Sequence, residues 1–323
     1  MPHFYPLAHR TLARVRQGAT SAALLLALAP VATLAADASA ILAAIKGAQI
    51  IDLSHMWEGD SPIASVNPPY AFKLDATHAK TRGMFQDGGQ LSFASEKMEF
   101  SGQHGAPTID ALGHIAREGK LFGGVDAAAT TTNDAGIGAS GTGSHLGIDS
   151  YPVSRLVNRG VMLDVASLVN GNLNPLPDTF EITSKHLQAA AARQKVKIQK
   201  GDTVFVRTGW GQYFKGDAKR YIGDNSPGLG VDGAAWLVKS GASVLGNDTA
   251  TFEQRPPIVK EPKFEVFPVH MQVIADAGVY IIENLDLEGL AKAKAYEFAV
   301  VVPPLKVKGG TGSPLRAFAL IAK

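Results

Sequence analysis

The stretch Gly160-Val-Met-Leu-Asp-Val165 decides the fold class, because its short apolar run is typical of a strand buried in a sheet. A helix at 183–194 and a second strand, Gly201-Asp-Thr-Val-Phe-Val-Arg-Thr208, are expected to follow it. Further expected elements are helices at 38–46 and 231–240, strands at 49–53, 242–246, 279–283 and 298–302, and a last element at 315–322. Strands that alternate with helices predict an α/β fold in a single domain.

Two segments predict loops because Gly, Pro and small polar residues are concentrated there. The first follows the strand at 49–53 and extends to about Lys97. The second, 127–147, is rich in Ala, Thr, Gly and Ser and predicts a flexible loop or insertion within the domain.

The composition excludes several classes of protein. The chain has 323 residues, of which 46% are hydrophobic and 19% charged, so it is neither a disordered chain nor a coiled coil. A formal net charge of +2 is too small for the basic surface of a nucleic-acid-binding protein. The sequence contains no cysteine, which excludes a disulfide framework, a thiolate nucleophile and a thiolate-bound zinc ion.

Residues 1–36 predict a secretory signal peptide that is removed. Three arginines and no acidic residue accompany an apolar run, 21–36, that ends in small residues. A membrane anchor is the alternative, but the run is shorter than the roughly 20 residues that a span needs, and Pro30 interrupts it. Without this leader, 28 basic and 29 acidic residues give a net charge of −1. We therefore expect a periplasmic or secreted domain, 37–323, with no nucleic-acid or membrane partner.

The densest polar cluster is Gln103-His-Gly-Ala-Pro-Thr-Ile-Asp-Ala-Leu-Gly-His114, which places His104, Asp110 and His114 within eleven residues. Imidazoles and a carboxylate are the ligands that a zinc- or manganese-type ion prefers when thiolates are absent. Because His104 and Asp110 are an even number of residues apart, they can share one side of an extended backbone. Ordinary polar loop residues are the alternative, since the run matches no general metal motif such as H-E-x-x-H.

His270 and Glu283 form a second candidate pair. Glu283 follows Val279-Tyr-Ile-Ile, so we expect it at the carboxyl end of a strand, where α/β proteins place functional groups. Taken alone, His270 is equally well explained as a buried histidine with satisfied partners, and Glu283 as a carboxylate at the start of a helix. Together with the first cluster they would complete a site of the form His, Asp, His, Glu.

The chain resembles the metal-dependent cyclase-like hydrolases, which include bacterial kynurenine formamidase and isatin hydrolase. Their hallmark is H-x-G-T-H-x-D-x-P-x-H, and the run from His104 to His114 matches its first histidine, its aspartate and its last histidine. The resemblance extends from about residue 49 to 323. Its further blocks are Asp52-Leu-Ser-His55, Gly201-Asp-Thr-Val-Phe-Val-Arg-Thr-Gly-Trp210, Gly246-Asn-Asp-Thr249, Ile282-Glu-Asn-Leu285 and Pro304-Leu-Lys-Val-Lys-Gly-Gly-Thr-Gly-Ser-Pro314.

This resemblance implies a swivelling β/β/α-type fold with a mixed central sheet, a bound zinc or manganese ion, and a homodimer or larger homo-oligomer. It places metal ligands at His104, Asp110, His270 and Glu283, and the catalytic acid/base at His114. The reaction that it implies is hydrolysis of a carbon–nitrogen bond in a small-molecule amide or cyclic amide. A histidine that titrates near neutral pH suits the proton transfers of that reaction.

Thr108 is the main departure from the family pattern, because it stands where the family has its second histidine. Threonine is a poor ligand for zinc, so the site would hold one ion with more water, select another metal, or have lost hydrolysis. One alternative is therefore a non-hydrolytic or inactive member, such as a lyase or a small-molecule-binding protein. Another is a periplasmic ligand-binding protein without a metal, which the leader supports equally well.

Overall fold

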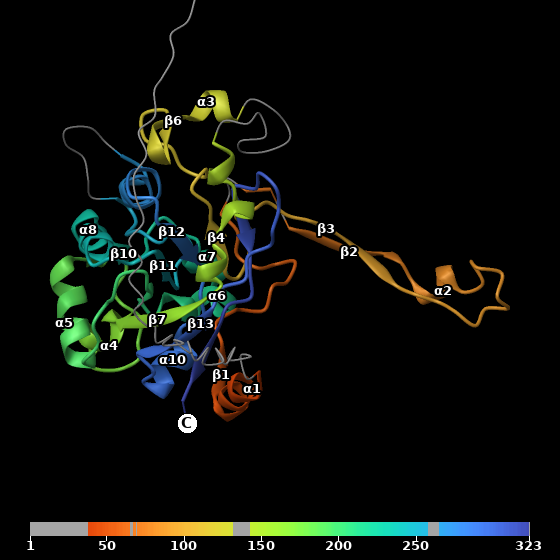
Figure 1. Cartoon of the computed structure of the whole chain (residues 1–323), viewed down its shortest axis with the longest axis horizontal. Coiled ribbons are helices and arrows are strands. Elements are labelled where there is room, and N and C mark those ends of the chain that lie inside the picture. Colours follow the sequence, from red (N-terminus) through yellow and green to blue (C-terminus); the bar gives the residue numbers. More distant parts are fainter. Residues whose placement is uncertain (1–37, 65–66, 69, 132–142, 258–264, 323) are drawn as a thin grey trace, which may run out of the picture. The chain divides into compact units, whose positions relative to one another are not determined.

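A mixed sheet organises the chain. The computed structural model describes residues 38–322, apart from 65–66, 69, 132–142 and 258–264. Within this part of the chain, nine strands form one sheet in the order β1-β15-β13-β7-β9-β11-β12-β4-β14 (Figure 1). The neighbours among β7, β9, β11 and β12 are parallel, and all other pairs in this sheet are antiparallel. The strands are β1 Gln49–Asp52, β4 Thr108–Asp110, β7 Val157–Asp164, β9 Thr203–Arg207, β11 Val244–Asn247, β12 Tyr280–Glu283, β13 Glu297–Val301, β14 Gly312–Pro314 and β15 Phe318–Ile321.

Helices cover one face of the sheet because alternate residues of the central strands are apolar on that side. On β7, Val161 and Leu163 belong to this layer, in which they pack with Leu187 of α5 and Leu237 of α8. The helical segments that contribute to the layer are α4 Val165–Asn170, α5 Ser184–Gln194, α8 Val231–Lys239, α9 Pro268–His270 and the π-helical segment η6 Met271–Asp276.

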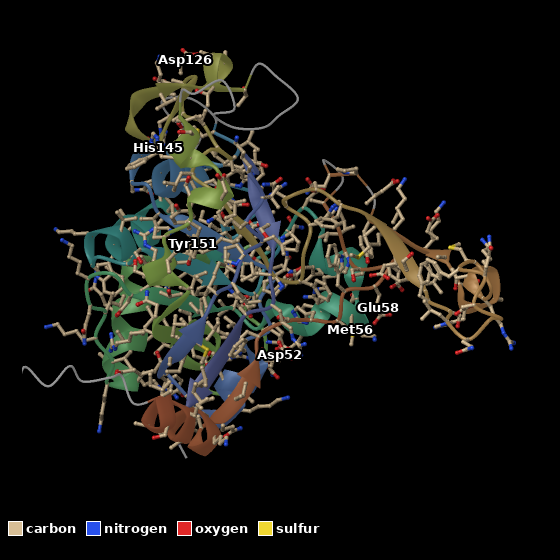
Figure 2. The ribbon with its side chains drawn as sticks, turned by 45° about the vertical axis from the view of Figure 1, so that its right-hand side comes forward. Asp52, Met56, Glu58, Asp126, His145 and Tyr151 are labelled. Carbon is tan, nitrogen blue, oxygen red and sulfur yellow. The ribbon has the colours of Figure 1, made fainter. Side chains whose placement is uncertain are left out.

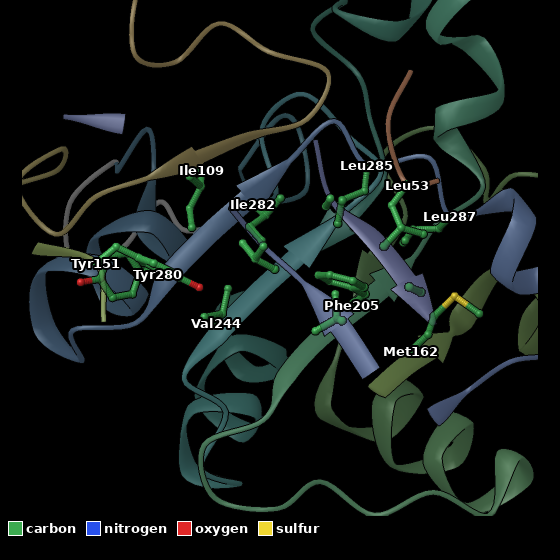
Figure 3. Packing of buried hydrophobic residues seen from close by; sticks show 14 of the residues in the cluster. Leu53, Ile109, Tyr151, Met162, Phe205, Val244, Tyr280, Ile282, Leu285 and Leu287 are labelled. Carbon is green, nitrogen blue, oxygen red and sulfur yellow. The ribbon is translucent and has the colours of Figure 1, made fainter. Parts of the chain in front are cut away.

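The intervening residues of the same strands build a second core on the opposite face. Met162 of β7, Phe205 of β9 and Ile282 of β12 lie in this cluster, which Figure 3 shows. Leu290 of α10 (Glu288–Ala293) packs against it as well. The two-residue period of apolar side chains therefore places apolar residues on both faces of the central strands, as expected for parallel strands that are covered on both sides.

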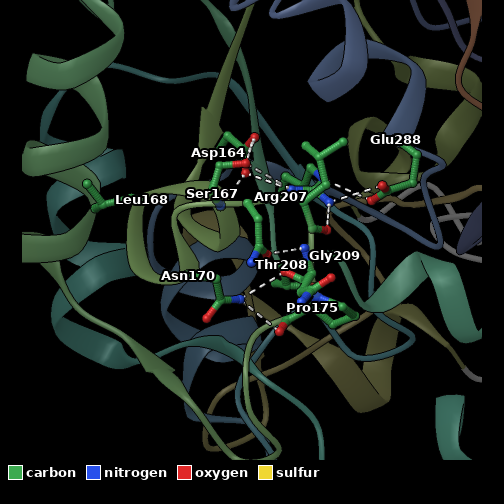
Figure 4. A network of polar contacts seen from close by, with 12 residues as sticks. Asp164, Ser167, Leu168, Asn170, Pro175, Arg207, Thr208, Gly209 and Glu288 are labelled. Atoms are coloured by element: carbon green, nitrogen blue, oxygen red, sulfur yellow. Dashed lines mark hydrogen bonds and ion pairs between the residues drawn. The ribbon is translucent and has the colours of Figure 1, made fainter.

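A buried ion-pair network joins β7, β9 and α10 (Figure 4). The fully buried guanidinium of Arg207 contacts Asp164 at 2.9 Å and Glu288 at 2.8 Å. It also donates to the carbonyl of Leu173 at 2.6 Å. Asp164 in turn accepts from the backbone N–H of Ser167 at 2.9 Å and caps α4. One cation thus neutralises two carboxylates that would otherwise be costly to bury.

Most elements expected from the sequence are present, with ends displaced by up to three residues. The expectation of loops up to about Lys97 is wrong, because β2 (Ala71–Ala76), α2 (His78–Thr81) and β3 (Ser95–Glu99) lie there. The long connection between these strands offers no tight-turn signal that would reveal their pairing. The short elements are α1 Ala38–Gly47, β5 Lys120–Leu121, β6 Val125–Asp126, α3 Ala127–Thr130, β8 Glu181–Ile182, α6 Tyr213–Gly216, α7 Ala218–Tyr221 and β10 Gly228–Leu229.

Residues 43–323 form one compact unit. The expected signal peptide, 1–36, lies outside the described residues, and so does most of the loop expected at 127–147. Among the helices that the structure describes, none has the length and apolar character needed to cross a bilayer.

Candidate metal centre and active-site pocket

Strand pairing brings Asp110 and Glu283 together although they are 173 positions apart in the sequence. Asp110 ends β4 and Glu283 ends the antiparallel neighbour β12. Their register pairs Asp110 with Ile281 and Glu283 with Thr108. Paired residues share a face of the sheet, and so do residues two apart on one strand. The two carboxylates therefore lie diagonally on the same face.

His270 approaches this face from α9, which precedes β12 in the chain. Its side chain is buried, and its Nε2 lies 3.1 Å from Glu283 Oε1 and 3.7 Å from Asp110 Oδ2. Asp110, His270 and Glu283 each offer a ligand atom, and these atoms lie within 4.8 Å of one another. The structure thus brings together three of the four residues expected to bind the metal.

The polar atoms of this cluster fit a cation. Both carboxylate oxygens of Asp110 are buried and have no hydrogen-bond partner among the residues that the structure describes. A buried carboxylate without partners is costly, so an unsatisfied one indicates a missing positive charge. Two carboxylates and an imidazole form a donor set that suits a zinc- or manganese-type ion.

Glu253 holds the His270 ring in place, and sequence reasoning did not identify it. Its Oε1 lies 2.6 Å from His270 Nδ1, and the same carboxylate accepts the backbone N–H groups of Val269 and His270 at 3.3 and 3.1 Å. A carboxylate at Nδ1 keeps a proton there, so that Nε2, which faces Asp110 and Glu283, is the atom that would bind a metal ion once its own proton is displaced. Glu253 belongs to no recognisable motif, so only its position in the fold reveals this role.

Burial perturbs the protonation of the cluster. It raises the pKa of Glu283 to about 7, and the nearby charge of Asp110 acts in the same direction. Burial alone would lower the pKa of His270, but the hydrogen bonds to Glu253 and Glu283 raise it well above its usual value. A metal ion entering the cluster therefore has to displace protons.

His104 and His114 line the same pocket but are not among the atoms within 4.8 Å of one another. His104 is buried, and its Nδ1 accepts the backbone N–H of Ser101 at 2.5 Å. Burial lowers the pKa of His104, which favours the neutral ring. Nε2 of His114 lies 4.0 Å from Asp110 Oδ1, and the side chain is 27% exposed. The ligand role of His104 and the acid/base role of His114 stay predictions.

Two backbone carbonyls hold the hydroxyl of Thr108, which stands at the position of the family's second histidine. Its Oγ1 lies 3.1 Å from the carbonyl oxygen of Gly102 and 3.3 Å from that of Ser313. Because a hydroxyl has one proton, these two backbone acceptors already compete for it. The side chain thus ties β4 to its neighbouring segments.

The cluster opens into a cavity of about 230 Å³. Apolar and aromatic side chains form much of its wall, including Trp57, Ile63 and Phe267, and the amides of Gln103 and Asn284 add polar groups. The amide of Asn284 donates to the carbonyl of Gly105 at 3.3 Å and thereby connects β12 to the histidine-bearing loop. A wall of apolar groups with a few polar ones is typical of a small-molecule site.

The chain is similar to known proteins of one family. Residues 51–254 match a family model described as "Putative cyclase". A curated isatin hydrolase from Roseibium aggregatum is 30% identical over 160 residues. That match covers 46% of this chain and 54% of the relative, so it spans about half the length of the curated relative.

Solved structures extend the likeness over most of the chain. One described as a novel cyclase has a TM-score of 0.72 at 27% identity, and the match covers 87% of this chain and 91% of the other. Isatin hydrolase A from Ralstonia solanacearum has a TM-score of 0.66 at 20% identity, covering 90% and 98%. The latter likeness shows the fold alone. The family model spans more than half of the chain, and this chain therefore belongs to the Cyclase family.

Proposed function

We propose that the protein is a metal-dependent hydrolase that cleaves the carbon–nitrogen bond of a small amide or cyclic amide. The observation that carries this proposal is the buried set of Asp110, His270 and Glu283, in which both Asp110 oxygens lack hydrogen-bond partners within the described part of the chain. A divalent cation, zinc or manganese, would neutralise these carboxylates and remove the cost of burying them. The similarity to an isatin hydrolase supports the type of bond.

The residues of the site suit a hydrolytic reaction. A bound divalent ion would supply Lewis-acid chemistry, lowering the pKa of a water and polarising a substrate carbonyl. Asp110 and Glu283 provide the negative charge that retains the ion, and Glu253 orients the His270 ring toward it. His114 takes a proton from the water that attacks the carbonyl carbon. It returns the proton to the nitrogen as the C–N bond breaks, which leaves an amine and a carboxylic acid that then loses its proton to solvent.

The pocket favours a compact, flat substrate. Its volume of about 230 Å³ lies below the range of roughly 300–1,000 Å³ that is usual for drug-sized ligands. Trp57 and Phe267 line the cavity and can contact an aromatic ring there. The side-chain amides of Gln103 and Asn284 can hydrogen-bond to a carbonyl and an N–H group. We therefore propose isatins and aryl formamides as the substrates to test first.

A metal-loading experiment tests the proposal. The protein is stripped of metal, reloaded with zinc or manganese, and assayed by elemental analysis and by hydrolysis of isatins, aryl formamides and lactones. We expect a bound ion and turnover of one of these compounds. Glu283→Gln should reduce both, whereas the exposed Glu297→Gln on β13 should reduce neither. A protein that retains no divalent ion after reloading contradicts the proposal.

A second candidate function is that of a non-hydrolytic or inactive family member, such as a lyase or a small-molecule-binding protein. The observation that favours it is Thr108, whose hydroxyl is engaged by backbone carbonyls and cannot restore a histidine ligand. One outcome of the metal-loading experiment distinguishes the two candidate functions. A metal-loaded protein that binds a compound of the panel and returns it unchanged is a binding protein.

We also propose that residues 1–36 direct export to the periplasm or the medium, and that the mature chain, 37–323, forms a homodimer or a larger homo-oligomer. The basic and apolar pattern of the leader supports export. Amino-terminal sequencing of the exported protein should find a start near Asp37. A start at Met1 would contradict the export proposal.

A further inference from the structure

Asn284 presents a side-chain amide to the cavity that contains the metal cluster. It directly follows Glu283 at the end of β12, and its φ of 61° places its backbone in the left-handed region. Asparagine tolerates this conformation because its short polar side chain can hydrogen-bond locally. The backbone N–H of Asn284 donates to the carbonyl of Thr249 at 3.0 Å. The backbone thus fixes where the amide lies, and its hydrogen-bond partners decide which way it is turned.

A carbonyl on one side of the amide determines its orientation. Nδ2 of Asn284 lies 3.3 Å from the carbonyl oxygen of Gly105. A carbonyl oxygen can only accept a hydrogen bond, so the atom beside it has to be the nitrogen. The backbone at Gly105 packs so closely against Pro107 and Pro314 that a Cβ atom would not fit, which holds this carbonyl in place. Oδ1 of Asn284 therefore faces the other way.

Tyr221 of α7 supplies the matching donor for Oδ1. Its hydroxyl lies 2.9 Å from that carbonyl oxygen, which can only accept, so the hydroxyl donates. Tyr221 is 1% exposed and packs with Trp210 and Phe214. The indole N–H of Trp210 donates to the backbone carbonyl of Tyr221 at 3.2 Å, which anchors the tyrosine. Burial raises the pKa of Tyr221 well above its usual value, so the hydroxyl keeps its proton at neutral pH.

We propose that Tyr221 turns the Asn284 amide so that its second N–H is offered to an acceptor oxygen of the substrate. An amide NH₂ group has two N–H bonds, and Gly105 receives one of them. The other is available in the cavity that Asn284 lines. Asn284 is then a substrate-binding residue and Tyr221 a positioning residue. The inference rests on the proposed function for a substrate in this cavity, and it adds the group that is recognised, a carbonyl or another acceptor oxygen.

This orientation makes Asn284 a donor toward the cavity. An amide turned over would place Oδ1 against the carbonyl of Gly105, where two acceptors repel each other. Without the hydroxyl of Tyr221, however, Oδ1 loses its donor, and the buried oxygen would gain by turning away in search of another. The tyrosine therefore stabilises the orientation in which an acceptor oxygen of a bound compound is recognised.

Binding of a matched pair of probes to the metal-loaded protein tests the proposal. Acetophenone carries one carbonyl oxygen on a small aromatic skeleton, and ethylbenzene has a CH₂ group in place of that carbonyl. Neither compound contains a C–N bond, so their binding does not depend on hydrolysis. Titrations followed by ligand-observed NMR give both dissociation constants. The ratio of the two constants measures how strongly the protein recognises the oxygen.

Two single variants and their combination separate the roles of the two residues. Tyr221→Phe removes only the hydroxyl, and Asn284→Gly removes the amide while glycine accepts the left-handed backbone. We expect each to weaken binding of acetophenone about 3- to 10-fold and to change that of ethylbenzene less than about twofold. Because Tyr221 acts through Asn284, the double variant should bind acetophenone no more weakly than Asn284→Gly alone. Elemental analysis should find the wild-type metal content in all three.

Tyr151→Phe is the matched control. Tyr151 is another buried tyrosine, and its hydroxyl donates to the carbonyl of Arg155 at 3.2 Å. It does not line the cavity. Figure 2 shows it well apart from Met56 and Glu58, the chain neighbours of the cavity residue Trp57. We therefore expect this variant to bind both probes with wild-type affinity.

Equal weakening of both probes by Tyr221→Phe would indicate a loss of cavity shape and overturns the proposal. Losses that add in the double variant overturn it as well, because Tyr221 would then act independently of Asn284. The same holds for a wild-type protein that does not bind acetophenone, and for an Asn284→Gly protein that binds it unchanged. The proposed function fails separately, since a protein that shows the expected binding and hydrolyses no amide contradicts only the hydrolase assignment.

Discussion

The clearest test of the site concerns Glu253, which does not line the cavity and acts through His270. The change Glu253→Gln keeps the size of the side chain but removes its charge. The carboxylate now accepts three hydrogen bonds, from His270 Nδ1 at 2.6 Å and from the backbone N–H groups of His270 and Val269. An amide at this position presents an NH₂ group to some of these donors, so at least one hydrogen bond is lost.

The magnitude follows from the role of such carboxylates. Replacing the partner of a metal-binding histidine typically lowers metal affinity by about 10- to 100-fold, which corresponds to about 1.4–2.7 kcal/mol. Competition of the protein with a chelator for zinc measures this change directly. Glu297→Gln, an exposed change on β13, serves as the control and should leave the affinity unchanged. An unaltered affinity in a correctly folded Glu253→Gln protein would refute the proposed orientation of His270.

Three further predictions follow from the structure. Apparent metal affinity should rise with pH through about 7, because burial raises the pKa of Glu283 to about 7 and the ion needs the carboxylate. Calorimetry in buffers of different ionisation enthalpy measures the protons released, and an affinity independent of pH between about 6 and 8 contradicts the reasoning. His114→Ala should retain the metal and lose turnover by roughly 100-fold or more, and equal loss of both would make His114 a ligand. Arg207→Met should lower the free energy of unfolding in urea by about 3–5 kcal/mol, because it leaves buried carboxylates unpaired. Arg316→Met, at an exposed ion pair, should lower the free energy of unfolding by less than about 1 kcal/mol. Similar decreases for the two arginine variants would show that burial of the ion pair does not determine its contribution to stability.

Local sequence pattern predicted the central strands and helices well. The apolar run 160–165 and the strand 201–208 are recognisable because both faces of their strands are covered, which demands consecutive apolar residues. The paired strands β2 and β3 escaped prediction because the Gly and Pro residues before them and in their long connection favour a loop and outweigh the short apolar and polar alternation of the strands. β4 and β14 are only three residues long and lie among Gly and Pro residues, so their local signal is weak.

The sequence by itself determined the fold class, the family and the residue types of a thiolate-free metal site, because local periodicity and the spacing from His104 to His114 are properties of the chain alone. Only the tertiary structure decided which candidates meet. The register of β4 against β12 places Asp110 beside Glu283, and the packing of α9 delivers His270. The tertiary structure also places Glu253 against the ring of His270 and directs the hydroxyl of Thr108 toward backbone carbonyls. Such contacts depend on strand pairing between distant segments, and no local pattern along the chain records that pairing.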